Sequence, residues 1–306
     1  ALPHNESLIY QRKNDHISIA LTEASQFTKS TGFEEYYFEH KALPEIDFSE
    51  IDISCEIMGK KLKAPLLISS MTGGPKQGSK INQRLAKAAQ MKGIGMGLGS
   101  QRIVFESPDS LQSFQIRDIA PDILLLSNLG AVQLNYGFGE KECRQAVEQV
   151  QADALYFHLN PLQEVIQPEG DTNFKNLWPI LEHLCQVLPF PVLLKECGCG
   201  ISESTAKKAQ EIGIYGIEVS GAGGTSWSRI EGLRSPKTIE KKIGETFANW
   251  GITTPRPIQA CRRASQTMKV IGSGGLRTGL DMAKAIALGS DLVSTARPFL
   301  EAAMIS

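Results

Sequence analysis

The stretch PVLLKECGCGISESTAKKAQEIGIYGIEVSG, residues 191–221, contains the pattern that decides the fold. Two short apolar runs, PVLLKECG and GIEVSG, stand at its ends, and each run finishes in small or polar residues. Near-continuous apolarity over about four to six residues is typical of a strand buried on both faces, as in a parallel sheet covered by helices. The stretch therefore predicts two buried strands, and the segment between them can form a crossover helix.

Six further runs of this kind occur from about residue 65 onward, so the chain holds eight in all. They are PLLISSMTG (65–73), GIGMGLGSQ (93–101), DILLLSNLG (122–130), ALYFHLN (154–160), KVIGSGG (269–275) and DLVSTA (291–296). Between the runs, apolar residues recur at helical spacing, most clearly over 177–188 and 81–89 and more loosely at Leu280, Ala283 and Ala287. Eight strands with crossover helices match the strand count of a (β/α)₈ barrel.

The residues at the ends of the runs distinguish a closed barrel from an open sheet. A barrel gathers all eight strand ends at one mouth, whereas an open doubly wound sheet spreads them along a row. Unusual residues stand at or just past the carboxyl end of every run, and they are Thr72, Gln101, Asn128, His158, Lys195, Ser220, Gly274 and Thr295. We therefore predict an α/β fold of the (β/α)₈ TIM-barrel type, with these residues around one mouth.

The length and net charge of the chain limit its possible domain organisation and function. The 306 residues fit a single barrel domain, residues 61–306, with an N-terminal extension over residues 1–60. The 32 Lys and Arg residues against 33 Asp and Glu residues leave a formal net charge of −1. No diffuse basic field is therefore expected to bind nucleic acid or an anionic membrane.

The chain also lacks the marks of a membrane or secreted protein. No apolar stretch reaches the roughly 18 to 20 residues of a membrane span, and the first residues lack the apolar core of a secretory signal. The six cysteines include no CxxC pair, so they resemble neither a disulfide framework nor a zinc site. We expect a cytoplasmic protein in which Cys197 and Cys199 are packing residues near a strand end.

Two segments do not follow the barrel repeat. We expect residues 54–61 to form a small hairpin that closes the bottom of the barrel. The connection from Ser220 to Lys269 is far longer than the usual two to six or so residues. A connection of that length is usually an active-site lid or partly disordered, so we expect it to be mobile without ligand.

The motif GSGGLRTGLD, residues 272–281, follows the seventh run and opens a helix. Glycines let the backbone approach a phosphate, and amides after the last two barrel strands, with a helix N-terminus, form an anion site. Arg277 beside the glycines favours phosphate binding over a merely compact turn. The motif is neither a Walker A loop nor a dinucleotide fingerprint, so a mononucleotide or sugar phosphate fits better. GAGGTS (221–226) offers amides and hydroxyls to a second ligand group, or serves as a hinge.

Three further groups of residues carry chemistry. Lys195 at a strand end can form a Schiff base, pair with a ligand anion or stabilise negative charge on a flavin ring, or simply pair with a neighbouring carboxylate. The stretch HLNPLQE holds His158, Asn160, Gln163 and Glu164. A histidine and a carboxylate in one mouth can act as acid and base, or the carboxylate can hold Mg²⁺. Arg12 and Lys13 would be an ordinary solvated pair if they stood alone.

Several motifs together resemble those of type 2 isopentenyl diphosphate isomerases. In chain order they are QRKNDH, SSMTGG, GLGSQR, SNLGA, HLNPLQE, KECGCGIS, GAGGTSW and SGGLRTGLDMAKAIALGSD. The resemblance covers the chain from Arg12 to the C-terminal region, and HLNPLQE with GAGGTSW is quite specific to this family among FMN barrels. It implies an FMN-dependent barrel enzyme that interconverts isopentenyl and dimethylallyl diphosphate with reduced FMN and Mg²⁺. It also implies a reductant of the flavin, NADPH or another, and a homotetramer or homooctamer.

The resemblance assigns roles to individual residues. Contacts to the FMN ring and ribityl chain fall on Ser70, Met71, Thr72, Ser100, Asn128, Lys195, Ser220 and Thr225. Contacts to the FMN phosphate fall on Gly275, Leu276, Arg277, Ala296 and Arg297, and Arg297 stands where an apolar residue is commoner. Substrate diphosphate would meet Arg12, Lys13, Ser100, Gln101 and Arg102, and Glu164 would anchor Mg²⁺. The isoprenoid pocket would be lined by His158, Asn160 and Gln163, with Glu231 as an acid near the substrate.

The chemistry leaves alternatives open. A diphosphate of charge about −3 needs several cations and a metal in a mouth of low dielectric. In one mechanism, reduced flavin serves as acid and base, and Lys195 stabilises its anionic ring. In the competing mechanism, a proton is relayed through Gln163 and Glu231. His158 is a further candidate catalytic group. Other hypotheses are an FMN oxidoreductase of the hydroxy-acid oxidase or dihydroorotate dehydrogenase kind, a Schiff-base aldolase, and a non-catalytic flavin- or phosphate-binding protein.

Overall fold

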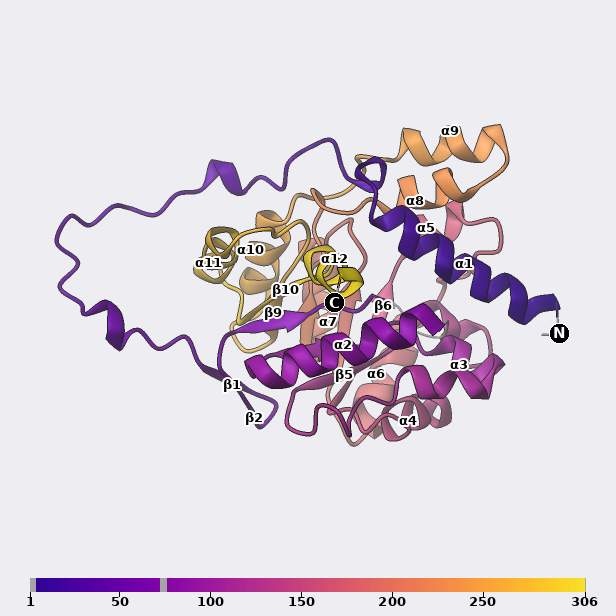
Figure 1. Ribbon diagram of the computed structural model, residues 1–306, viewed down its shortest axis with the longest axis horizontal. Coiled ribbons are helices and arrows are strands. Elements are labelled where there is room, and N and C mark those ends of the chain that lie inside the picture. The colour runs from indigo at the N-terminus through magenta and orange to yellow at the C-terminus, as the bar shows by residue number, and fades with distance from the viewer. Residues whose placement is uncertain (1–3, 72–75, 306) are drawn as a thin grey trace.

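The computed structural model describes residues 4–71 and 76–305, and its centre is a closed barrel of parallel strands surrounded by helices (Figure 1). Around the barrel the strand order is β10-β3-β4-β5-β6-β7-β8-β9. The strands are β3 (Leu66–Ile68), β4 (Gly95–Gly97), β5 (Leu125–Gly130), β6 (Ala154–Leu159), β7 (Val192–Glu196), β8 (Gly216–Glu218), β9 (Lys269–Gly272) and β10 (Leu292–Thr295). Each lies in one of the eight predicted runs, so the TIM-barrel prediction is confirmed.

Helices cover the outside of the barrel and its mouth. They are α1 (His4–Ala20), α2 (Lys76–Lys92), α3 (Arg102–Glu106), α4 (Glu140–Glu148), α5 (Pro161–Ile166), α6 (Leu177–Val187), α7 (Glu203–Glu211), α8 (Trp227–Arg234), α9 (Thr238–Thr246), α10 (Pro255–Ala264), α11 (Gly279–Ala287) and α12 (Arg297–Ile305). Short 3-10 helices occupy Glu23–Ser25, Phe33–Glu35, Phe48–Glu50, Pro108–Ser113 and Ala131–Asn135. No described helix has both the length and the apolar character that crossing a membrane requires.

The predicted helical stripes are right for one helix and wrong for another. In α6, Leu177, Leu181 and Leu184 are buried against the barrel, as their spacing predicts. In α11 the expected stripe is exposed, with Leu280 at 57%. Ala285 is the buried residue of α11, so the helix turns a different face to the barrel. Its residues are almost all apolar or small, and spacing alone could not choose between these faces.

A hairpin closes the N-terminal end of the barrel, as predicted. Strands β1 (Cys55–Ile57) and β2 (Lys60–Leu62) pair antiparallel through a turn in which Met58 and Gly59 have φ values of 51° and 71°. Positive φ at both central residues is the geometry of a type I′ turn. Ile57 and Leu62 join the apolar cluster that fills the barrel interior. The predicted boundary between extension and barrel, residue 60/61, thus falls inside β2.

The long connection after Ser220 is folded and is not a loop. It contains α8, α9 and α10, and α8 packs against α1, α5 and α9. The Ser228 hydroxyl donates to the carbonyl of Gly244 at 2.7 Å, and the two helices cross where Gly232 meets Gly244. The expectation of partial disorder is therefore wrong, and the alternative of an active-site lid that is mobile without ligand stays a prediction. Helices α8 and α9 lie on the same side of the molecule as α1, whereas α10 lies beside α11 (Figure 1).

One segment leaves the body of the molecule. Residues 36–54, here called the arm, run out from the barrel in an extended course and return at β1 (Figure 1). The arm carries a set of large apolar side chains that are at least half exposed: Tyr37, Phe38, Leu43, Ile46, Phe48, Ile51 and Ile53. Monomeric proteins rarely expose so much contiguous apolar surface.

The interior position of Leu62 generates a prediction about stability. Replacing Leu62 by Ala should lower the free energy of unfolding by about 2–5 kcal/mol, because the cavity forms in a closed barrel that cannot collapse around it. The matched control is Met91→Ala, since Met91 is 68% exposed and its truncation should change stability by no more than about 0.5 kcal/mol. Urea unfolding measures both values, and equal effects would contradict the proposed closure by the hairpin.

Candidate active site

A pocket opens at the carboxyl ends of the barrel strands, and all eight strand ends contribute to its lining. Helix α1 lies across its rim and adds Arg12, Lys13 and His16. The predicted residues that line it are Arg12, Lys13, Ser70, Met71, Ser100, Arg102, Asn128, His158, Asn160, Gln163, Glu164, Lys195, Ser220, Thr225, Gly275, Arg277, Ala296 and Arg297. Barrel closure therefore brings together segments that are up to 285 or so residues apart in the sequence.

Two predicted contacts are not supported by the structure, and a third cannot be placed. Gln101 is fully buried in the barrel wall, where its amide donates to the carbonyl of Ala146 at 2.8 Å and its oxygen accepts from the backbone of Asn128. Its side chain is thus occupied within the wall and does not reach the pocket. The Leu276 side chain packs in the hydrophobic core, so only its backbone is left for a phosphate. Thr72 lies outside the described residues.

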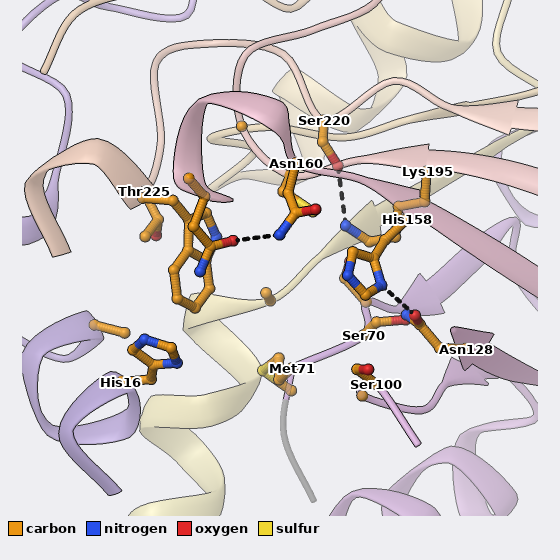
Figure 2. Close-up of a pocket in the computed structure, with 18 of the residues that line it drawn as sticks. His16, Ser70, Met71, Ser100, Asn128, His158, Asn160, Lys195, Ser220 and Thr225 are labelled. Atoms are coloured by element: carbon orange, nitrogen blue, oxygen red, sulfur yellow. Dashed lines mark hydrogen bonds between the residues drawn. The ribbon is translucent and has the colours of Figure 1, made fainter. Parts of the chain in front are cut away.

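The pocket floor carries a buried lysine. Lys195 Nζ donates to the backbone carbonyl of Glu196 at 2.9 Å and to Ser220 Oγ at 3.2 Å (Figure 2). Burial is the largest effect and acts to lower the pKa of Lys195, but the charges of Glu218, Cys197 and Glu196 together raise it above its ordinary value. The ammonium is therefore fully charged at neutral pH. Beside it, the buried Ser70 hydroxyl has no hydrogen-bond partner among the described residues, so it is available to a ligand.

His158 is held as a neutral imidazole. Its Nδ1 lies 2.8 Å from Asn128 Oδ1 (Figure 2). Burial, together with the charges of Lys195, Lys13 and Arg102, lowers the pKa of His158 to about 3. At neutral pH the imidazole carries one ring proton. Nδ1 donates this proton to Asn128, so Nε2 is an acceptor. His158 can therefore accept a hydrogen bond in the pocket, but it is not an acid there.

Glu231 lies directly behind the pocket wall and is permanently ionised. It is fully buried and accepts hydrogen bonds from His16 at 2.8 Å, Gln163 at 2.9 Å and Arg234 at 2.9 Å. Burial acts to raise its pKa, but the contact with His16 and the other donors lower it to about 2. The carboxylate thereby fixes the amide of Gln163, whose oxygen accepts from Asn160 at 3.1 Å.

Glu164 is a second buried carboxylate, and it faces the pocket. It accepts from Asn160 Nδ2 at 2.8 Å and from the backbone of Asp171 at 2.7 Å. Burial raises its pKa above the ordinary value. Asn160 turns its Nδ2 atom toward Glu164, and its buried Oδ1 atom has no hydrogen-bond partner among the described residues. The pocket thus offers two hard oxygen donors, one of them charged, although the part of the chain that the structure describes contains no cluster of three His, Cys, Asp or Glu side chains suited to a metal.

Cations gather on the same side of the mouth as Glu164. Arg102 reaches Asp171 at 2.6 Å and Glu106 at 2.8 Å, which fixes its guanidinium at the rim. Lys13 has a pKa lowered to about 8, first by burial and then by the charge of Arg12. An anion placed between these groups would remove that repulsion. The arrangement is suited to a ligand with several negative charges.

Glycines shape the opposite side of the mouth. A Cβ on Gly274 would meet the backbone oxygen of Gly221 at 2.2 Å, and one on Gly224 would meet the nitrogen of Gly275 at 2.6 Å. The two glycine-rich loops therefore interlock backbone to backbone. This close packing accounts for the glycines of GAGGTS better than a hinge does.

The predicted helix N-terminus is already occupied. Thr278 and Asp281 form a capping box that satisfies the first amides of α11. The helix that begins at the pocket is α12, where Ala296, Arg297 and Leu300 line the wall. Arg277 lies close enough to Arg297 for that charge, after burial, to lower its pKa. The groups that could hold a phosphate here are the glycine loop, the start of α12 and this pair of arginines.

The structure adds residues that the sequence reasoning missed. His16 packs edge-on against Trp227, with ring centroids 5.1 Å apart, and both line the pocket. With its amide oriented to satisfy its neighbours, Gln167 donates to Glu231 and accepts from Arg12, both at 3.2 Å. His16 stands four residues after Arg12 on the same helix face, and that spacing is the signal that could have found it.

The low pKa of Glu231 predicts how stability depends on pH. A carboxyl group that titrates near 2 when folded and near its ordinary 4.5 when unfolded stabilises the fold above pH 4.5, and this contribution is lost as the pH falls toward 2. Glu231→Gln cannot ionise. We expect the stability difference between the natural chain and this variant to be constant above about pH 5.5 and to shrink on acidification. Urea unfolding at pH 7, 5, 4 and 3 measures it, and an unchanged difference at pH 3 would refute the assignment.

Comparison with known proteins places the chain in a family. The model of the FMN-dependent dehydrogenase family matches residues 144–306. The isopentenyl-diphosphate delta-isomerase of Nostoc sp. is 51% identical over 96% of this chain and 85% of its own length, and that of Rickettsia bellii is 49% identical over 97% and 86%. Among solved structures, (S)-mandelate dehydrogenase aligns over 96% of this chain and 87% of its own, with a TM-score of 0.63 at 18% identity.

A flavocytochrome b2 mutant gives a TM-score of 0.64 at 17% identity over 98% of this chain and 75% of its own. At this level of identity, these solved structures support the barrel fold alone. The relatives near 50% identity match over nearly the whole chain and carry one activity in their names. The chain belongs to the family of FMN-dependent, type 2 isopentenyl-diphosphate delta-isomerases.

Proposed function

We propose that the chain interconverts isopentenyl and dimethylallyl diphosphate, with reduced FMN and Mg²⁺ bound at the barrel mouth. The observation that carries this proposal is the meeting of Arg12, Lys13 and Arg102 with the Glu164 carboxylate on one side of a pocket whose floor holds a charged lysine. A diphosphate needs several cations and a metal in such a site. The names of the relatives near 50% identity support the same assignment.

The residues present fit FMN. The unpartnered Ser70 hydroxyl and the Lys195 ammonium offer a donor and a positive charge to the ring, and the interlocked glycine loops with Arg277 and Arg297 offer amides and cations to the phosphate. When bound and reduced, FMN supplies an electron-rich ring whose nitrogens can give and take a proton. NADPH or another reductant of the same kind would keep it reduced.

The residues present also fit Mg²⁺. Magnesium is usually held by one or two carboxylates together with substrate phosphate oxygens, and it prefers hard oxygen ligands. Glu164 and the unpartnered Oδ1 of Asn160 are such oxygens, and they lie on the same side as the substrate cations. The bound ion would neutralise part of the diphosphate charge and orient it.

The protonation states of the side chains bear on proton transfer. Glu231 is an anion and His158 is neutral at pH 7, so neither supplies a proton as an acid. This supports reduced flavin as the acid and base, with Lys195 balancing the charge of its ring. In the competing assignment Gln163 and Glu231 relay the proton, and their contact at 2.9 Å is the feature that favours it. The role of His158 is then to accept a hydrogen bond and to position Asn128.

We also propose that the chain acts as one catalytic unit over residues 1–306, in the cytoplasm, as a homotetramer or homooctamer. Helix α1 in the extension contributes Arg12, Lys13 and His16 to the barrel pocket, which supports a single unit. All six cysteines are free thiols in the structure, as expected in a reducing compartment. The arm supports self-association, since its apolar side chains lack cover within the described chain and a second copy would bury them.

The direct test is proton NMR of isopentenyl diphosphate with the protein, FMN, Mg²⁺ and dithionite in D₂O under nitrogen, beside an oxidised control. Deuterated dimethylallyl diphosphate in the reduced sample alone would establish the isomerase. Absence of exchange, with FMN shown to be bound, would reject it and favour the oxidoreductase hypothesis, which the name of the matching family model also suggests.

Glu164 is predicted to control the metal requirement. Glu164→Gln should raise the Mg²⁺ concentration for half-maximal activity by about tenfold or more, because a neutral amide is a weaker ligand than a carboxylate. The control is Glu182→Gln, an exposed residue of α6 outside the pocket, which should leave the Mg²⁺ curve unchanged. Identical curves for the natural chain and Glu164→Gln would remove Glu164 from the metal site.

The arm predicts the effect of surface changes on assembly. Ile46→Ser with Phe48→Ser should shift the particle to a lower mass in light scattering after gel filtration, because these side chains are 66% and 87% exposed in one copy. The matched control is Met91→Ser with Ile239→Ser, which changes two exposed apolar residues away from the arm. An unchanged mass for the arm variant would mean that the arm does not join copies.

A further inference from the structure

Glu218 is a buried carboxylate that the proposed chemistry does not yet use. It is the last residue of β8 and is 0% exposed. A carboxylate is almost never fully buried unless it is paired, because the charged form loses its hydration. The position of Glu218 in β8 does not explain the presence of a buried carboxylate either, since the rest of the run GIEVSG is apolar or small. The structure around Glu218 must therefore supply the compensation.

The side chain of Glu218 points across the inside of the barrel. Its Oε1 accepts from Ser69 Oγ at 2.8 Å and from Ser294 Oγ at 3.0 Å. Ser294 belongs to β10 and Ser69 follows β3, and neither strand is a neighbour of β8. Both serines line the pocket floor, so the carboxylate lies just beneath that floor. Two hydroxyls alone are modest compensation for a buried charge, and Oε2 has no hydrogen-bond partner among the described residues.

The missing compensation is the charge of Lys195. Lys195 on β7 is paired in register with Glu218 on β8, so both side chains leave the sheet on the inner face at the same level. Lys195 Nζ itself donates to the Glu196 carbonyl and to Ser220, so the carboxylate acts on it through space. In the barrel interior, with its low dielectric, such an interaction is strong.

The other titratable groups that face Lys195 contribute less than Glu218 does. His158 on β6 is neutral at pH 7 and repelled by the lysine. The Glu196 side chain is turned into the backbone, where Oε2 accepts from the amides of residues 197–200. Burial raises the pKa of the Cys197 thiol to about 12, so it is uncharged. Tyr156 below Glu218 is likewise neutral, since burial and then the charge of Glu218 raise its pKa well above 10.0. Among the charged groups around Lys195, Glu218 contributes most to keeping the ammonium protonated, and Glu196 contributes less.

We propose that Glu218 is the counterion of Lys195 and, through that lysine, a positioning residue for the flavin ring. The carboxylate keeps the ammonium charged on the pocket floor, and the lysine in turn meets the negative charge of the reduced ring. A charged lysine is not a nucleophile, so the same pairing suppresses Schiff-base chemistry at this position. The inference rests on the proposed flavin site, and it concerns only the charge of Lys195.

The experiment compares the full chain with Glu218→Gln, with Lys195→Met and with the double variant. Competitive acetylation of Lys195 in flavin-free protein, read by mass spectrometry from pH 7 to 10, reports the protonation of the amine directly. In the natural chain the amine should stay protected from acetylation over this whole range, whereas in Glu218→Gln acetylation should set in within it, because a buried lysine without a counterion loses its proton readily. Ser294→Ala is the matched control, since it removes one hydrogen bond to Glu218 and leaves the charge in place. The control should keep the natural titration.

Flavin binding gives the second readout. The dissociation constant for FMN, from quenching of its fluorescence, should rise with pH between 7 and 10 in Glu218→Gln and stay flat in the double variant, which has no amine. An unshifted acetylation profile in folded Glu218→Gln would overturn the proposal, and so would the same pH dependence of binding in the double variant. Neither readout involves substrate, so failure of the isomerase assay and failure of this inference are separate results.

A measurement of stability tests the proposal even if Glu218→Gln is too unstable for the two assays above. If Glu218 is a counterion, removing the lysine charge as well should restore stability, so the double variant should unfold at a higher urea concentration than Glu218→Gln. If Glu218 only joins Ser69 to Ser294, the double variant will be no more stable than the single one, and the proposal is wrong.

Discussion

Closure of the barrel is the constraint on which the rest of the structure depends. Parallel strands that close on themselves have all their carboxyl ends at one rim, so residues at or near those ends can meet around one space. This is how Ser70, Asn128, His158, Lys195 and Ser220 become neighbours in one pocket. The apolar lower half of the barrel, sealed by the β1–β2 hairpin, fixes the height of the floor on which they stand.

Buried charge is the second organising principle, and each case is compensated in its own way. Glu231 is held by three donors and stays ionised, whereas Glu196 is turned into the amides of its own strand end. Glu164 has only two donors and a raised pKa, as suits a group that awaits a cation. Glu218 is compensated by a lysine on the neighbouring strand. All four residues are glutamates, but their different surroundings give their carboxylates different functions.

Under the proposed function, the positions of these charges would separate the substrate from the cofactor. The cations on α1 and α3 and the carboxylate on α5 lie on one side of the mouth, and the glycine loops with Arg277 lie on another. A phosphate on each side, one from cofactor and one from substrate, would be held apart across the pocket. The extension is therefore part of the site, since Arg12 and Lys13 reach the mouth only because α1 packs on α8.

The sequence by itself determined the barrel. A strand buried on both faces must be apolar and short, and eight runs of this kind can be recognised in the sequence. It also determined the composition of the mouth, since residues after a buried strand are free of the packing constraint and stand out. The tertiary structure alone decided which of them turn inward. Gln101 stands near the carboxyl end of an apolar run as Asn128 does, yet its amide forms hydrogen bonds within the wall, and no local pattern distinguishes the two. His16, Trp227 and Glu218 reach their partners across more than a hundred residues of chain or across the barrel interior, and only the closed fold sets those distances.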